Sequence, residues 1–185
     1  MNFLATEWFW AMAQAVGVLV TLGLISWQVR LQTATHVVQT LGAMHQRWSE
    51  HAMLRARHAV CDRYLRSDLA FDSVSDYIAE FMEELGNYVK IKAIPPAVMW
   101  DAQSWYVEHY YSMFKAGIEE RRQIYHEELL YQNFQDLFDL LKQQSKKHRA
   151  PSADRGPEDL RRFAEDELRV TSAFLQLQAG GSVTP

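Results

Sequence analysis

Residues 9–27 read FWAMAQAVGVLVTLGLISW, and this stretch decides how the chain is organised. It belongs to a longer segment, from Trp8 to Val29, that contains no Asp, Glu, Lys or Arg. At about 1.5 Å of rise per residue, a helix of these 19 residues reaches about 28 Å, close to the thickness of the hydrocarbon core of a bilayer. We therefore predict a transmembrane anchor over residues 1–29.

The flanks of the anchor predict that it is retained and how it is oriented. No Lys or Arg precedes it, and Ile25-Ser26-Trp27 lacks the small residues of a signal-peptide cleavage site. Arg30 follows the anchor directly, whereas Glu7 precedes it. The positive-inside rule then puts the N-terminus outside and the remaining residues in the cytoplasm. A buried helix of a soluble protein is the alternative interpretation.

A polar seam runs along this apolar helix. Every seventh residue is polar, in the series Glu7, Gln14, Thr21, Gln28 and Thr35. A spacing of seven drifts by only about 20° per heptad, so the series stays on one side of the helix. Glutamine and threonine in lipid need a partner helix or water. The seam predicts either a dimer contact between copies or the lining of a pore built by several copies; a chance pattern is the third interpretation.

The remaining residues predict an all-α protein, in which the anchor helix continues into a cytosolic helical bundle. Apolar residues follow helical spacing, and no strand pattern occurs. Only Gly42 would interrupt a helix through residues 31–66, Gly117 is a plausible helix end, and a further helix is expected from Ile124. We expect a cytosolic domain over 30–143, a polar linker over 144–156 and an amphipathic helix over 157–178.

Composition narrows the function classes. The net charge of −4 argues against a protein dedicated to coating nucleic acid, and the single Cys61 excludes an internal disulfide. Nearby Arg57, His58 and Arg63 could lower the pKa of Cys61, or the thiol could simply fill space in the core. Histidines 45, 51 and 58 are spaced by six and seven residues, which does not bring three metal ligands together. We expect neither a metal site nor a cofactor.

One short motif offers chemistry. Residues 121–126 read RRQIYH and fit Arg-x4-His, the motif of HEPN-type helical ribonucleases, which the segment resembles. That resemblance implies that Arg121 stabilises the charge of a scissile phosphate and that His126 transfers a proton. The alternative is a structural one, in which Arg121 and Arg122 pair with neighbouring glutamates.

The order of elements over about residues 8–142 resembles a bacterial family of membrane-anchored helical proteins of unknown function. The resemblance rests on the anchor, on FMEELG at 81–86, on Trp100 before an aromatic helix and on Arg121-Arg122. The layout is also similar to the membrane accessory proteins of type VI-B CRISPR systems. It implies a homo-oligomer that perturbs membranes in antiviral defence, with membrane lipid, copies of itself and a CRISPR effector nuclease or RNA as partners.

Our leading hypothesis from the sequence is a non-enzymatic, homo-oligomeric inner-membrane effector, whose seam residues face either each other or the water of a pore. A membrane-anchored HEPN-like ribonuclease is the second hypothesis. A membrane-tethered scaffold for a soluble partner is the third.

Overall fold

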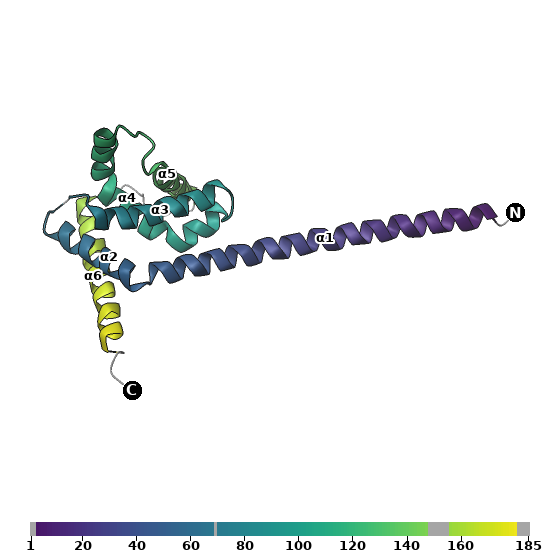
Figure 1. Cartoon of the computed structure of the whole chain (residues 1–185), viewed down its shortest axis with the longest axis horizontal. Coiled ribbons are helices and arrows are strands. Elements are labelled where there is room, and N and C mark those ends of the chain that lie inside the picture. Colours follow the sequence, from purple (N-terminus) through teal and green to yellow (C-terminus); the bar gives the residue numbers. More distant parts are fainter. Residues whose placement is uncertain (1–2, 69, 148–155, 181–185) are drawn as a thin grey trace. The chain divides into compact units, whose positions relative to one another are not determined.

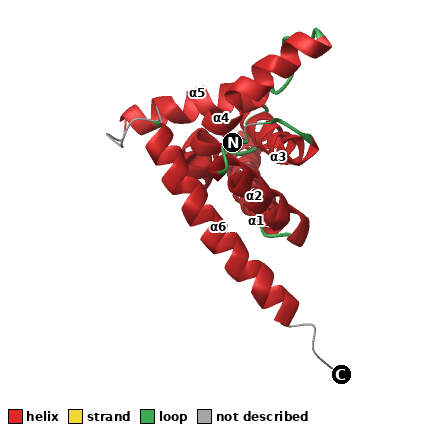
Figure 2. Cartoon of the chain, turned by 90° about the vertical axis from the view of Figure 1, so that its left-hand side faces the viewer, coloured by secondary structure: helices red, strands yellow, loops and turns green. Residues whose placement is uncertain are grey.

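The computed structural model describes residues 3–68, 70–147 and 156–180. Within these residues it contains helices and loops and no strand, which confirms the predicted all-α class (Figure 2). Contacts between Cα atoms divide the chain into two compact units, Met1–Met44 and His45–Pro185. Along the chain (Figure 1) the helices are α1 (Phe3–Trp48), α2 (His51–Leu65), α3 (Ser73–Lys90), α4 (Pro96–Tyr125), α5 (Gln132–Lys147) and α6 (Pro157–Gly180).

Helix α1 is one uninterrupted helix of 46 residues that passes through Gly42. Every residue from Trp8 to Gln28 is exposed, and this stretch of 21 residues is long and apolar enough to cross a membrane. The sequence therefore correctly predicted the length and apolar character of the anchor helix and its continuation beyond residue 29.

The long helix ends at Trp48, whereas the sequence predicted continuity to residue 66. Glu50 adopts an extended conformation (φ −64°, ψ 147°) and separates α1 from α2. The last carbonyls of a helix lack partners within the helix, and Arg57 Nη1 donates to the Trp48 carbonyl at 3.0 Å. A side chain from the following helix thus stabilises the break, which explains why local propensity did not reveal it.

The core of the unit His45–Pro185 is built around aromatic rings. Trp48 is buried and stacks on Phe81 of α3 with a centroid distance of 5.2 Å. Its ring also meets Tyr106 and Tyr110 of α4 edge-on, at 5.0 and 5.9 Å. Helix α6 packs most extensively on α2, and α5 packs on α3 and α4. Tyr110, Tyr111 and Phe114 of α4 are therefore core residues, whereas Trp105 of the same helix is exposed.

Helix α4 extends eight residues beyond Gly117, the predicted end, because it terminates at Tyr125. Gly117 is needed for a close approach and not as a cap: a Cβ there would lie 2.3 Å from Cβ of Phe71. The actual cap is His126, which adopts the left-handed conformation at φ 51° and ψ 36°. Residues 124 and 125 therefore belong to α4 and not to the start of the next helix.

The C-terminal boundaries differ slightly from those predicted. Helix α5 continues to Lys147, so residues 144–147 are helical and do not belong to the linker. Residues 148–155 of the predicted linker lie outside the described residues. Helix α6 begins at Pro157 with Glu158 and Asp159 in its first turn, as the sequence predicted.

We expect Gly86→Ala to destabilise the domain although alanine favours helices more than glycine does. A Cβ at residue 86 would lie 2.1 Å from the Asn133 backbone oxygen of α5. The gain in helix propensity is at most about 1 kcal/mol, whereas overpacking costs about 1–3 kcal/mol. Thermal unfolding followed by circular dichroism should show a lower Tm.

Gly42→Ala is the matched control, because no atom lies within 4 Å of the Cβ that it would add. Its Tm should equal or exceed that of the wild type. Equal Tm values for Gly86→Ala and the wild type would show that the contact between α3 and α5 is looser than described.

Candidate functional site

The seam residues of α1 differ in what their side chains do. Gln14 and Gln28 are exposed, and the side chain of Glu7 lies outside the described residues. The Thr21 hydroxyl donates to the carbonyl of Gly17, one turn earlier, at 2.8 Å. Threonine can therefore lie in lipid without a partner from another helix, because its one donor is satisfied within α1.

Gln14 is the seam residue with the greatest need for a partner. Its primary amide carries two donor hydrogens and an acceptor oxygen, and it lies well inside the stretch Trp8–Gln28. Gln28 is the last residue of this stretch, where an amide would reach the interfacial water. In a bilayer, Gln14 is therefore the group whose hydrogen-bonding capacity favours contact with a neighbouring helix.

Arg121 faces the loop between α2 and α3. Its Nη1 lies 2.6 Å from an Asp76 carboxylate oxygen, and its Nη2 donates to the Phe71 carbonyl at 3.1 Å. The guanidinium carbon also lies 5.1 Å from the centre of the Phe71 ring. Arg121 therefore fixes α4 to this loop and to α3, and its carboxylate partner is Asp76 and not one of the neighbouring glutamates of the structural alternative.

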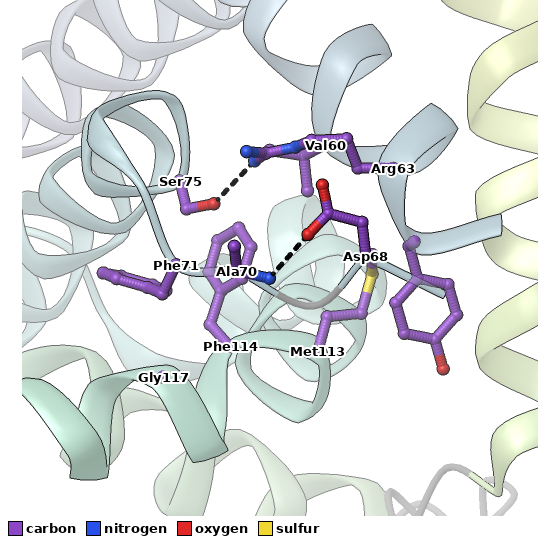
Figure 3. A pocket seen from close by; sticks show the side chains of 10 residues that line it. Val60, Arg63, Asp68, Ala70, Phe71, Ser75, Met113, Phe114 and Gly117 are labelled. Atoms are coloured by element: carbon purple, nitrogen blue, oxygen red, sulfur yellow. Dashed lines mark hydrogen bonds between the residues drawn. The ribbon is translucent and has the colours of Figure 1, made fainter. Parts of the chain in front are cut away.

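The loop that Arg121 contacts is held tightly against α4. Phe71 lies beside Gly117, and Ser75 accepts a hydrogen bond from Arg63 at 3.1 Å (Figure 3). The Asp72 carboxylate accepts hydrogen bonds from the first amides of α3 and pairs with Arg63. Burial alone would raise the pKa of Asp72, but these hydrogen bonds and the charge of Arg63 lower it overall.

His126 and Arg122 line the same cavity, whereas Arg121 does not line it. A cavity of about 400 Å³ is lined by Arg122, His126 and three neighbours, Glu119, Gln123 and Glu128. Arg122 Nε donates to the Leu130 carbonyl and Nη1 to Gln135, each at 2.9 Å. Two carboxylates line the cavity that a phosphate would have to enter, which disfavours binding of RNA there. Catalysis by Arg121 and His126 stays a prediction.

A buried ion pair is the strongest polar feature of the domain, and sequence reasoning missed it. Arg57 of α2 and Glu167 of α6 are 3% and 4% exposed, and Nε and Nη2 of the arginine both contact Oε1 of the glutamate. The Tyr110 hydroxyl donates to the same oxygen at 3.3 Å. The Arg57 guanidinium also lies 4.1 Å from the centre of the Trp48 ring.

The sequence held one signal for this pair. Glu167 lies on the apolar stripe of α6, four residues after the buried Phe163 and four before the buried Thr171. A charged residue at a core position needs a buried partner. Sequence alone did not identify that partner, because Arg57 lies 110 positions away among other arginines.

The charges of the pair stabilise each other. Burial would lower the pKa of Arg57, but the Glu167 carboxylate raises it overall, so the guanidinium stays charged. Burial, followed by the influence of Cys61 and Glu167, raises the pKa of Tyr110 well above its usual range, so its hydroxyl remains a donor. The charged Arg57 and the protonated Tyr110 hydroxyl can thus both donate hydrogen bonds to Glu167.

Cys61 lies at the edge of this cluster and is not an activated thiol. It is fully buried, and its sulfur lies 3.9 Å from the Tyr110 hydroxyl. Burial, with a smaller contribution from Glu167, raises the pKa of Cys61 to about 12. The interpretation that neighbouring arginines lower this pKa is wrong, because the desolvation of the thiolate outweighs the attraction of Arg57.

The histidines noted in the sequence do not gather around a common point. His58 Nε2 lies 3.1 Å from the Ser172 hydroxyl of α6. Among the described residues, no group of three His, Cys, Asp or Glu side chains could hold a metal ion.

We expect Arg57→Met to lower the free energy of unfolding by about 3–5 kcal/mol, because it leaves the Glu167 carboxylate buried without its cation. The double variant Arg57→Met with Glu167→Leu should regain most of this loss, since it removes both charges. Chemical denaturation of the three proteins measures the effect. A double variant as unstable as the single one would show that volume and packing, not charge, determine the loss.

We expect the Cys61 thiol to resist alkylation at pH 8. Its burial requires the domain to open first, so labelling should be about a thousandfold or more slower in the folded chain than in denaturant. Mass spectrometry after iodoacetamide treatment measures both rates. Similar rates in the two conditions would mean that the thiol is accessible in the folded domain.

Protein-family models, curated proteins and solved structures were all compared with this chain, and none of them matches it.

Proposed function

We propose that this chain is a membrane-anchored protein that assembles with copies of itself through α1 and holds its helical domain at the cytoplasmic surface. The observation that carries the proposal is the uninterrupted exposure of Trp8–Gln28 without any charged residue. Soluble proteins seldom expose an apolar patch larger than a few hundred Å². A helix of 21 residues reaches about 32 Å, so a bilayer core of about 30 Å covers it.

The ends of the stretch support the same placement. Trp8 and Trp10 lie at one end and Trp27 at the other, each more than 60% exposed. Tryptophan is enriched at both membrane interfaces. Arg30 follows the stretch, as the positive-inside rule requires of a cytoplasmic flank.

Within the bilayer, small residues and Gln14 support a contact between copies. Ala13, Gly17 and Thr21 follow one another at intervals of four, which puts them on one face beside Gln14. Apart from the helix's own backbone and the neighbouring residues, no atom lies within 4 Å of the Cβ that a substitution at Gly17 would add, so a second helix can approach closely there. Such small-residue faces and amide hydrogen bonds hold transmembrane helices together.

Beyond the bilayer, the composition of α1 also favours a partner. Residues 31–46 contain no Asp, Glu, Lys or Arg, although Val38 in this stretch is 68% exposed. A lone helix in water relies on ion pairs along its surface, which this segment lacks. A heptad pattern continues from the stretch Trp8–Gln28 into this segment. Its a and d positions are apolar: Leu24, Trp27, Leu31, Ala34, Val38 and Leu41.

The same features favour contacts between helices over a water-filled pore. The Thr21 hydroxyl is satisfied by its own helix, and polar residues at 14, 21 and 28 flank the a and d positions. A lumen would need polar groups along its whole depth, and a single helix cannot enclose one. We therefore propose a parallel bundle of α1 helices as the basic assembly.

We expect Gln14→Leu to weaken this assembly. Losing an amide hydrogen bond between transmembrane helices costs about 1 kcal/mol, which corresponds to a roughly fivefold higher dissociation constant. The measurement is energy transfer between labelled full-length chains in lipid vesicles at varied protein-to-lipid ratios.

Leu19→Ala is the control, because residue 19 lies about 140° around the helix from residue 14. It should leave the dissociation constant unchanged. A wild type that stays monomeric at every ratio would overturn the proposal. If Leu19→Ala raised the dissociation constant as much as Gln14→Leu, the face of α1 that carries Gln14 would not be the contact between copies.

A further inference from the structure

The end of α4 presents an apolar surface to solvent. Ile124, Tyr125 and Leu129 are 63%, 60% and 72% exposed and lie within six consecutive residues. The turn after α4 is built by the left-handed His126 and by a hydrogen bond from the Glu127 amide to the Arg122 carbonyl at 3.1 Å. We call residues 124–129 the α4 tip.

The α4 tip is also acidic. Glu120, Glu127 and Glu128 are exposed at or beside it. The two arginines nearby do not offset these charges, because Arg121 pairs with Asp76 and Arg122 pairs with Glu119. A partner for this surface therefore needs an apolar recess with positive charge at its rim.

The same domain carries such a recess. A cavity of about 520 Å³ lies between the end of α3, the connection to α4 and the helix α5. We call it the α3–α5 groove. Its apolar lining consists of Val89, Ile94, Pro95, Pro96, Leu137 and Leu140.

The charges of the α3–α5 groove complement those of the tip. Lys90 and Lys92 line the groove and are exposed, and Lys90 Nζ donates to Asn133 at 2.8 Å. Asp136 also lines the groove, and the Gln132 amide donates to its carboxylate at 2.6 Å. The groove therefore carries a net positive charge beside an apolar recess, which is the chemistry that the tip requires.

We propose that the α4 tip of one copy docks into the α3–α5 groove of a neighbouring copy. The two surfaces consist of different residues, so the contact is head-to-tail and each copy offers one surface to each neighbour. Copies anchored in one membrane share their orientation relative to its plane, so contacts of this kind repeat within that plane and form a ring where the rotation per copy completes a full turn. This inference rests on the proposed membrane assembly and adds a second interface to it.

The test uses full-length chains in lipid vesicles with cysteines at the two surfaces. One chain carries Leu129→Cys in the tip and the other carries Leu140→Cys in the groove, while the buried Cys61 serves as the silent background. Mild oxidation of a mixture should yield a cross-linked pair of the two different chains. Adding Glu127→Lys and Glu128→Lys to the tip chain should reduce this product about tenfold.

Charge reversal on the other side provides the matched rescue. The groove chain with Lys90→Glu and Lys92→Glu should restore the cross-linked product when it is mixed with the charge-reversed tip chain. A mixture in which only one of the two chains is charge-reversed should give little product. No product from the unreversed mixture, a product insensitive to charge, or preferential pairing of two tips would overturn the docking. A parallel cross-link between Gln14→Cys chains reports α1 assembly separately, so failure of docking is distinguishable from failure of the proposed anchor bundle.

Discussion

The constraint on which the molecule depends is a run of 21 exposed residues in α1 without a single charge. Water does not solvate such a surface favourably, whereas a bilayer does. One membrane gives all anchors the same direction. The anchor, the charge-free continuation and the two complementary domain surfaces are the parts from which we propose one assembly.

Inside the domain, the buried pair of Arg57 and Glu167 joins elements that are distant in sequence. Arg57 contacts the carbonyl and ring of Trp48, the last residue of α1, while Glu167 belongs to α6. A buried ion pair is weak support for stability. It does disfavour alternative positions of a helix, because each of them would leave one charge buried without its partner. The pair thus specifies where α6 and the end of α1 meet α2.

The sequence revealed those features that depend on local pattern. The apolar anchor, the all-α class and the start of α6 at Pro157 follow from periodicity and from the chemistry of helix starts. The break after Trp48 and the pair with Glu167 depend on contacts across 9 and 110 positions, which no local pattern encodes. At the candidate site, the spacing of the seam residues is a local pattern, whereas the pairing of Arg121 with Asp76 of α3 is not.

Placing the middle of α1 in the bilayer is the central claim, and cysteine accessibility in open membrane fragments tests it most directly. Leu19→Cys and Gln39→Cys are both exposed positions of one continuous helix, and the native Cys61 is buried. A membrane-impermeant maleimide should label residue 39 rapidly and residue 19 only after detergent is added. Equal labelling of both positions without detergent would contradict the membrane placement.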